Sequence, residues 1–375
     1  MAAYIIRRIL QAIPVIVLIA VVSFGLMMAA PGGPAAQFNQ NPRMSVIEVE
    51  RYLARWCLER KPTPVGVLRT FGGWLGVINC EQRDPTGQNA TAEFFTAEGN
   101  LNILPGFLGG GNNGLLHGDF GRSMSTNREV GALISERIPA TLVLMTVSFL
   151  LWASIAVVLG TIAAVKRYSI YDQTVTAFSY IFYSLPTFWL GLMLIYLFSI
   201  TLGVLPSQGI IDTRAPGGWN TPQYWAGFWA DPLKWGFDIA RHLILPVTTL
   251  VAVNIAADSR YVRSSMLDTL NQDYVRTARA KGLPRRTVVF RHAFRNALLP
   301  IITNWALAVA FLFSGAIVTE TVFSWPGMGR LYIEAINTRD YFLVMGVLFI
   351  GSILVVLMNL VADVIYAWAD PRIRY

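Results

Sequence analysis

The sequence has 375 residues, of which 54% are hydrophobic and 14% are charged, and its formal net charge is +8. Soluble domains carry about 25% charged residues, so the composition argues against a large soluble protein. The apolar residues come in charge-free blocks, and in such a chain a basic balance reports which loops face the cytoplasm rather than binding to nucleic acid.

Six blocks are long and apolar enough to cross a bilayer, which takes about 20 residues per helix. They cover residues 9–30, 139–165, 175–203, 243–266, 297–319 and 342–367. Because lipid offers the backbone no hydrogen bonds, the blocks predict an all-α polytopic membrane protein with six transmembrane helices. The first block has the Arg7-Arg8 pair of a signal peptide, but it is long and lacks a clean cleavage site, so we expect an anchoring helix.

Basic residues gather on one side of the membrane if the six spans alternate. That side receives Lys166 and Arg167, Arg372 and Arg374, and a group between spans four and five: Arg263, Arg276, Arg279, Lys281, Arg285, Arg286, Arg291 and Arg295. By the positive-inside rule this side is the cytoplasm. We therefore expect both termini to be cytoplasmic.

Residues 31–137 carry ten acidic and ten basic residues, a balance expected of a segment on the outer side. The segment is too long for a passive loop, and residues 44–61 have helical spacing, so we expect a partly helical extracytoplasmic subdomain. Cys57 and Cys80, the only cysteines, both lie in it. A disulfide between them would contribute about 3 kcal/mol in the chain-entropy model; two unrelated thiols are the alternative.

The sequence lacks motifs for nucleotide hydrolysis, nucleophilic catalysis and metal binding. The sequence has no phosphate-binding loop and no nucleophile motif, and His117, His242 and His292 lack metal-ligand spacing. Three acidic residues, Asp258, Glu320 and Asp363, fall near the ends of predicted spans, where we expect hydration. The sequence therefore predicts neither an enzyme nor a bound metal or cofactor in this chain.

A basic stretch, "DYVRTARAKGLPRRTVVFRHAFRNALLP", follows the fourth span. Residues 273–281 are predicted to form a short helix that Gly282 ends, and Pro284 suits the first turn of a second helix over residues 284–296. The small residues Thr277, Ala278 and Ala280 would leave a low-profile face for a groove on a partner. The alternatives are a loop that touches anionic lipid and a nucleic-acid contact, and the latter lacks a folded soluble platform.

This stretch resembles the cytoplasmic signature of binding-protein-dependent ABC transporter permeases. Only Ala278 and Gly282 match the general "E-A-A-x-x-x-G" element, but "YVRTARAKGL" and "RHAFRNALLP" are typical of the dipeptide, oligopeptide and nickel class. Further similar segments are "AYIIRRILQAIPVIVLI", "GDFGRSMSTNREVGALISERIPATLVL", "FSWPGMGRLYIEAINTRDY" and "DPRIRY". Residues 35–115 depart from the shorter members of the family.

The resemblance implies one half of a type I ABC importer in the inner membrane of a bacterial or archaeal cell. Its protein partners would be a second permease of the same class, two ATPase subunits that bind ATP and Mg, and an extracytoplasmic solute-binding protein. The chain would also contact membrane lipid. The residues expected at the ATPase groove are Tyr274, Arg276, Thr277, Ala278, Arg279 and Gly282.

The resulting organisation has three parts: residues 1–30 with the first span, the outer subdomain 31–137, and a permease core 138–375 with a coupling region at 267–297. Pro186 is expected to kink span three, and Asn254 and Asn304 either line the pathway or make bonds between helices. Peptide is the expected cargo. A stand-alone channel or ion-coupled carrier and a membrane-anchored scaffold are the rival functions.

Overall fold

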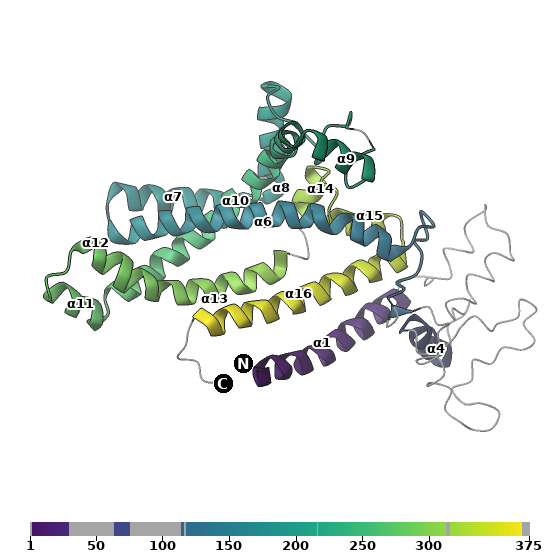
Figure 1. The fold of residues 1–375 in the computed structure, drawn as a ribbon, viewed down its shortest axis with the longest axis horizontal. Coiled ribbons are helices and arrows are strands. Elements are labelled where there is room, and N and C mark those ends of the chain that lie inside the picture. Colours follow the sequence, from purple (N-terminus) through teal and green to yellow (C-terminus); the bar gives the residue numbers. More distant parts are fainter. Residues whose placement is uncertain are drawn as a thin grey trace, which may run out of the picture. The chain divides into compact units, whose positions relative to one another are not determined.

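The computed structural model describes residues 2–29, 64–75, 114–115, 118–215, 217–312 and 316–369. All regular elements in these ranges are helices, apart from a single bridge between Arg122 and Glu129 (Figure 1). The chain divides into two compact units. Cys57, Cys80 and most of the predicted outer subdomain lie outside the described residues, so the disulfide and the subdomain stay predictions.

Four predicted spans correspond to long apolar helices. These are α1 (Ala2–Ala29), α6 (Val130–Val165), α10 (Pro232–Leu270) and α16 (Tyr341–Ala369). Each contains a stretch long and apolar enough to cross a membrane. Helix α10 extends well beyond the predicted span on both sides because Asp231 caps its first turn through Lys234 N at 3.2 Å and its polar C-terminal part stays helical.

The third predicted span is two helices rather than one. Helix α7 (Ile170–Ser184) and the pair α8 (Thr187–Leu194) and π-helix η2 (Ile195–Thr201) meet at an angle of 99°. Leu185 between them is extended, with φ −81° and ψ 129°. Proline disfavours helical backbone in the residue before it, so Pro186 explains a break where a kink was expected.

The fifth predicted span is only partly represented. Helix α13 (Arg295–Leu312) follows α12 (Arg285–Thr287) and π-helix η3 (Val288–Phe294), and α14 (Ile317–Val322) begins after residues 313–315. Within the described ranges four helices are candidate spans, or five if the bent pair counts as one. The predicted total of six stays a prediction.

In the first unit, residues 137–331 pack around α10, which contacts α7, α8 and α13. Helix α6 approaches α10 very closely at Gly160. A Cβ atom there would lie 2.5 Å from the carbonyl oxygen of Ser259, so only glycine permits this crossing. One buried cluster in this unit joins α10 to α11, η3 and α13 through Met266, Val275, Val289 and Ile301.

A polar junction starts α15 (Met328–Asn337) in the same unit. Thr141 Oγ1 accepts from Met328 N at 2.8 Å, and Glu320 Oε2 accepts from Arg330 N at 3.0 Å. These contacts satisfy amide groups that the first turn of a helix leaves without partners. Gly327 is required beside them, because a Cβ atom would lie 2.5 Å from both side chains.

The second unit contains α4 (Pro64–Leu75), α1 from Ile13 to its end and the start of α16. Phe24, Phe71, Trp74 and Phe349 form an aromatic cluster in it, with ring centroids 5.0 to 6.2 Å apart. Asp340 is fully buried and caps α16 through Leu343 N at 3.2 Å. Its carboxylate therefore fixes where the last span begins.

Candidate functional site

The predicted basic hairpin is present. Helix α11 (Asp273–Ala280) has Lys281 as its C-cap, and Gly282 follows with φ +72°, a backbone conformation that favours glycine. Gly282 N donates to the carbonyl oxygen of Arg279 at 3.0 Å. Pro284 then leads into α12, as predicted, but the second helix does not end at Asn296: α12, η3 and α13 run on to Leu312.

The inward face of α11 is formed by Val275 and Ala278, which are 0% and 5% exposed. They share one helix face because they are three residues apart, and they pack with Val288, Val289 and Ala293. Ala278 therefore contacts this chain's own core, which differs from its expected place on a partner-facing surface. Apolar packing against η3 accounts for this, since Ala278 has the only small apolar side chain on that face.

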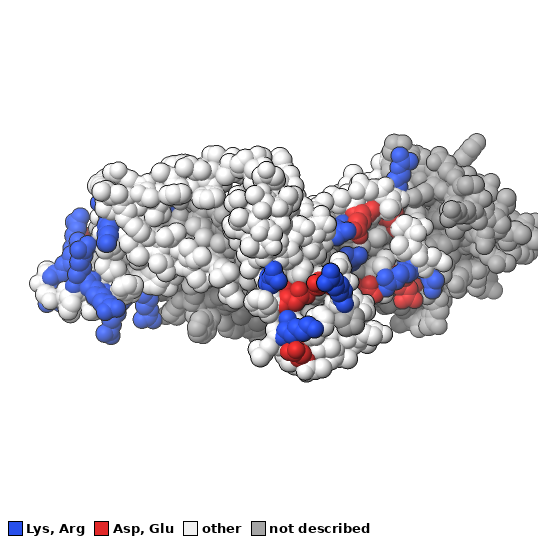
Figure 2. Space-filling view, turned by 90° about the horizontal axis from the view of Figure 1, so that it is seen from above, with Lys and Arg blue, Asp and Glu red and all other residues white. Residues whose placement is uncertain are grey.

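The outward face carries the other predicted coupling residues. Tyr274, Arg276, Thr277, Arg279 and Gly282 are all exposed. Lys and Arg side chains gather at this end of the first unit, where α11 and α12 lie (Figure 2). The contact between Arg276 Nη1 and Asp273 Oδ1 is 3.6 Å long and exposed, so it neutralises little of this charge. A Cβ atom at Gly282 would meet nothing within 4 Å, so the turn is open to a partner.

Two contacts tie the hairpin region to neighbouring helices. Arg285 Nη2 donates to the carbonyl oxygen of Val165, the last residue of α6, at 3.1 Å. Asp172 near the start of α7 accepts from Arg263 of α10 at 2.6 and 2.8 Å. The first contact joins the hairpin to α6, and the second joins α10, the helix before the hairpin, to α7.

Asp258 is a half-buried polar centre, whereas its position in the sequence predicted a hydrated helix end. Its Oδ2 accepts from Trp152 Nε1 at 3.0 Å and from Trp305 Nε1 at 2.8 Å. These indoles come from α6 and α13, so one carboxylate joins three candidate or predicted spans. A tryptophan within each of two spans was the signal that could have suggested an acceptor between them.

Glu320 also differs from expectation, because it is 0% exposed rather than hydrated. Thr141 Oγ1 donates to its Oε1 at 2.9 Å in the junction at the start of α15. Asp363 belongs to α16, but its side chain lies outside the described ones. The two described acidic residues are thus structural acceptors in the interior.

The three expected pathway residues lie on different helices. Pro186 precedes α8 at the break, Asn254 on α10 donates to the carbonyl oxygen of Leu250 at 2.7 Å, and Asn304 is half-buried on α13. No hydrogen bond between described residues joins any of them to another. The bond of Asn254 is local, so its assignment to the pathway stays a prediction, as does that of Asn304.

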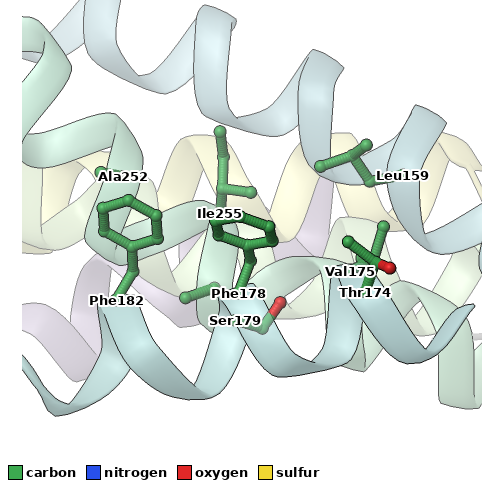
Figure 3. A pocket seen from close by; sticks show the side chains of 9 residues that line it. Leu159, Thr174, Val175, Phe178, Ser179, Phe182, Ala252 and Ile255 are labelled. Atoms are coloured by element: carbon green, nitrogen blue, oxygen red, sulfur yellow. The ribbon is translucent and has the colours of Figure 1, made fainter. Parts of the chain in front are cut away.

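An apolar cavity of about 290 Å³ lies between α6, α7 and α10. Phe178, Phe182 and Ile255 contribute most of its wall, with Thr174 and Ser179 as its polar members (Figure 3). It contains no titratable side chain. Nor do the described residues contain a group of three or more His, Cys, Asp or Glu that could hold a metal ion. The hairpin is therefore the stronger candidate site.

Comparison with known proteins identifies the family of the chain. Residues 156–375 match the family model described as binding-protein-dependent transport system inner membrane component. The oligopeptide transport system permease protein AppB of Bacillus subtilis is 36% identical over 376 residues, which cover 100% of both chains. The dipeptide transport system permease protein DppB of Escherichia coli is 40% identical over 268 residues, 70% of this chain and 78% of that protein.

A third relative, the di/tripeptide transport system permease protein DppB of Pseudomonas aeruginosa, is 42% identical over 267 residues, again 70% of this chain and 78% of that protein. The end-to-end alignment with the Bacillus subtilis protein includes residues 35–115. This segment is therefore shared with a full-length relative, although it departs from the shorter family members.

Proposed function

This chain belongs to the family of binding-protein-dependent transport system inner membrane components, and from that premise we propose that it is the permease subunit of an ATP-driven peptide importer. The observation that carries the proposal is the full-length similarity to an oligopeptide permease. Dipeptide and di/tripeptide permeases among the other relatives support the same cargo class. The chain is a transport component of the inner membrane, not an enzyme.

The division of labour follows from what the described chain contains. It has a basic hairpin at one end of long apolar helices and neither a phosphate-binding loop nor a run of ionisable groups suited to an ion relay. Transport against a concentration gradient then needs an energy source in another subunit. In the proposed assembly two ATPase subunits bind ATP and Mg, a second permease completes the pathway, and a solute-binding protein delivers the peptide.

The exposed face of α11 and the turn at Gly282 are the proposed ATPase contact. Its members are Tyr274, Arg276, Thr277, Arg279 and Gly282, with Ala278 holding the helix against the core from behind. When the ATPases close, they would push α11, and the buried cluster shared by α11, η3, α10 and α13 would carry the displacement into the spans. Packed interiors transmit strain because they have few voids. This orientation places the hairpin, and with it both termini, in the cytoplasm.

The test is reconstitution with the products of neighbouring genes. The full chain is purified with its candidate second permease and ATPases, placed in liposomes with ATP inside or outside, and supplied with binding protein and labelled trialanine. We expect uptake that requires ATP on the hairpin side and all subunits. Uptake by this chain alone, without ATP, would instead identify a channel or an ion-coupled carrier. Absence of trialanine, dialanine and longer-peptide uptake by the full assembly would refute the peptide cargo.

A further inference from the structure

Arg260 is a cation in a candidate span, and the described residues include no carboxylate partner for it. It lies on α10 between Asp258 and Arg263, which both have strong partners. Its Nε donates to the carbonyl oxygen of Ala256 at 3.0 Å, and the rest of its guanidinium makes no ion pair with a described residue. Ionisable residues inside spans are costly and therefore point to function.

Two tyrosines of α7 hold this guanidinium. Its central carbon lies 4.8 Å from the ring centroid of Tyr180 and 4.9 Å from that of Tyr183. The tyrosines are 57% and 58% exposed. Cation–π contacts orient the guanidinium while leaving its N–H groups available to another acceptor. In the cluster of Arg260, Tyr180 and Tyr183, the two exposed rings therefore orient a guanidinium that can donate hydrogen bonds to a ligand.

The side chain of Arg260 extends away from the basic end of α10. Its bond to Ala256 reaches back one turn toward the N-terminus, whereas the basic hairpin follows the C-terminus of the helix. An arginine that snorkels to lipid headgroups at the hairpin side would extend in the opposite direction. Tyr183 also lies at the far end of α7 from Asp172, which marks the hairpin side. A lipid headgroup at the hairpin side is thus the poorer ligand.

The cluster lies beside the break in the bent span. Tyr183 is followed by Ser184, the last residue of α7, and then by the extended Leu185 before Pro186. Broken helices inside a membrane are tolerated where they are buried in protein or line a water-filled cavity. A half-buried cation beside such a break, with no ion pair to a described residue, fits the second situation, because a charged group facing lipid hydrocarbon would be unfavourable.

We propose that Arg260, Tyr180 and Tyr183 bind the terminal carboxylate of the peptide as it passes the break in the α7–α8 span. A guanidinium offers paired N–H groups that match the two oxygens of a carboxylate, and the phenol hydroxyls can donate to further oxygens. A terminal carboxylate is present on every unmodified peptide, so this contact would accept cargo of varied side chains. The inference rests on the proposed peptide import.

The test compares trialanine with its C-terminal amide in liposomes that hold the complete transporter. The ratio of variant to unaltered uptake is measured for each peptide, so preferences of the binding protein cancel. For Arg260→Gln we expect uptake of trialanine at low concentration to fall about 10-fold or more, the effect of losing one charged hydrogen bond. Uptake of the amide should change far less. Arg214→Gln, which removes an exposed cation elsewhere, should leave both ratios near one.

Two further variants guard against simple misfolding. Tyr183→Phe keeps the ring beneath Arg260 and should retain most uptake, whereas Tyr183→Leu removes it and should lower trialanine uptake selectively. Equal losses for the acid and the amide would overturn the carboxylate contact. So would an Arg260→Gln effect that vanishes in phosphatidylcholine liposomes free of anionic lipid, since it would assign the guanidinium to a lipid headgroup with a net negative charge. Failure of the unaltered assembly to import any peptide would refute the proposed function itself.

Discussion

Arg263 of α10 donates two hydrogen bonds to the carboxylate of Asp172 of α7, from Nε at 2.6 Å and from Nη2 at 2.8 Å. The same carboxylate accepts from the backbone N–H of Tyr168 at 2.9 Å, so it also shapes the turn between α6 and α7. Only 4% of the Asp172 side chain is exposed. The pair therefore joins α7 to α10 near the start of α7 and the end of α10.

Breaking this pair should destabilise the protein and loosen coupling. Asp172→Asn leaves Arg263 without its charged partner, and we expect a loss of about 2 to 3 kcal/mol in the free energy of unfolding, since Arg263 is partly exposed. Thermal unfolding in detergent measures the loss, and ATP consumed per peptide imported measures coupling. The control is Arg263→Gln combined with Asp172→Asn, which should cost less than the two single effects added. Strict additivity would show that the pair is not coupled.

A large side chain at Gly282 should block the proposed ATPase contact, while the backbone strain that it adds at positive φ is confined to an exposed turn. No described residue lies within 4 Å of a Cβ atom there, so we expect a side chain to meet a partner or solvent. We expect Gly282→Trp to abolish ATP-driven uptake and to remove the ATPases from the purified complex. Gly282→Asn is the matched control, because asparagine tolerates the positive φ of +72° at small cost. Normal uptake by the tryptophan variant would contradict the docking role.

Removal of the Asp258 carboxylate should lower the stability of the protein, because the two indole N–H groups around it lose their acceptor. Asp258→Leu leaves Trp152 Nε1 and Trp305 Nε1 without their acceptor, and each unsatisfied buried donor costs about 1 to 3 kcal/mol. We expect a marked fall in the thermal midpoint of the purified transporter. Adding Trp152→Phe and Trp305→Phe to Asp258→Leu removes the unsatisfied donors and should recover part of that fall. No recovery would mean that the carboxylate stabilises the protein by another route.

Tyr224 on α9 (Pro222–Ala230) should make stability fall at high pH. It is fully buried, and its hydroxyl has no hydrogen-bond partner among the described residues. Burial, followed by the nearby charge of Asp238, raises the pKa of Tyr224 to about 12. Because the folded state favours the protonated phenol, this contribution is complete below about pH 10, the unfolded value, and is lost as the pH rises toward 12.

Tyr224→Phe removes both the titration and the unsatisfied hydroxyl. We expect the variant to be as stable as the unaltered chain or up to about 1 kcal/mol more stable near neutral pH, since no hydrogen bond is lost. Its unfolding midpoint should also decline less between pH 10 and 12. Chemical denaturation in detergent at several pH values provides the comparison. A clear loss of stability at neutral pH would reveal a partner for the hydroxyl outside the described residues.

Local signals in the sequence predicted much of this protein. Runs of apolar residues identified α1, α6, α10 and α16, because a helix that crosses lipid must be apolar along its own length. Gly282 and Pro284 predicted the turn of the basic hairpin, since backbone restrictions of glycine and proline act within a few residues. The motifs around them also indicated the family that full-length comparison then showed.

Tertiary packing decided what those signals could not contain. Asp258 gained its acceptor role from indoles on α6 and α13, and Glu320 its role from Thr141, all far away along the chain. Ala278 turned inward because η3 supplied an apolar surface against it. Composition shows how hydrophobic a segment is. The partner of a buried polar group is determined only when distant helices pack together, because a polar group removed from water must form a hydrogen bond.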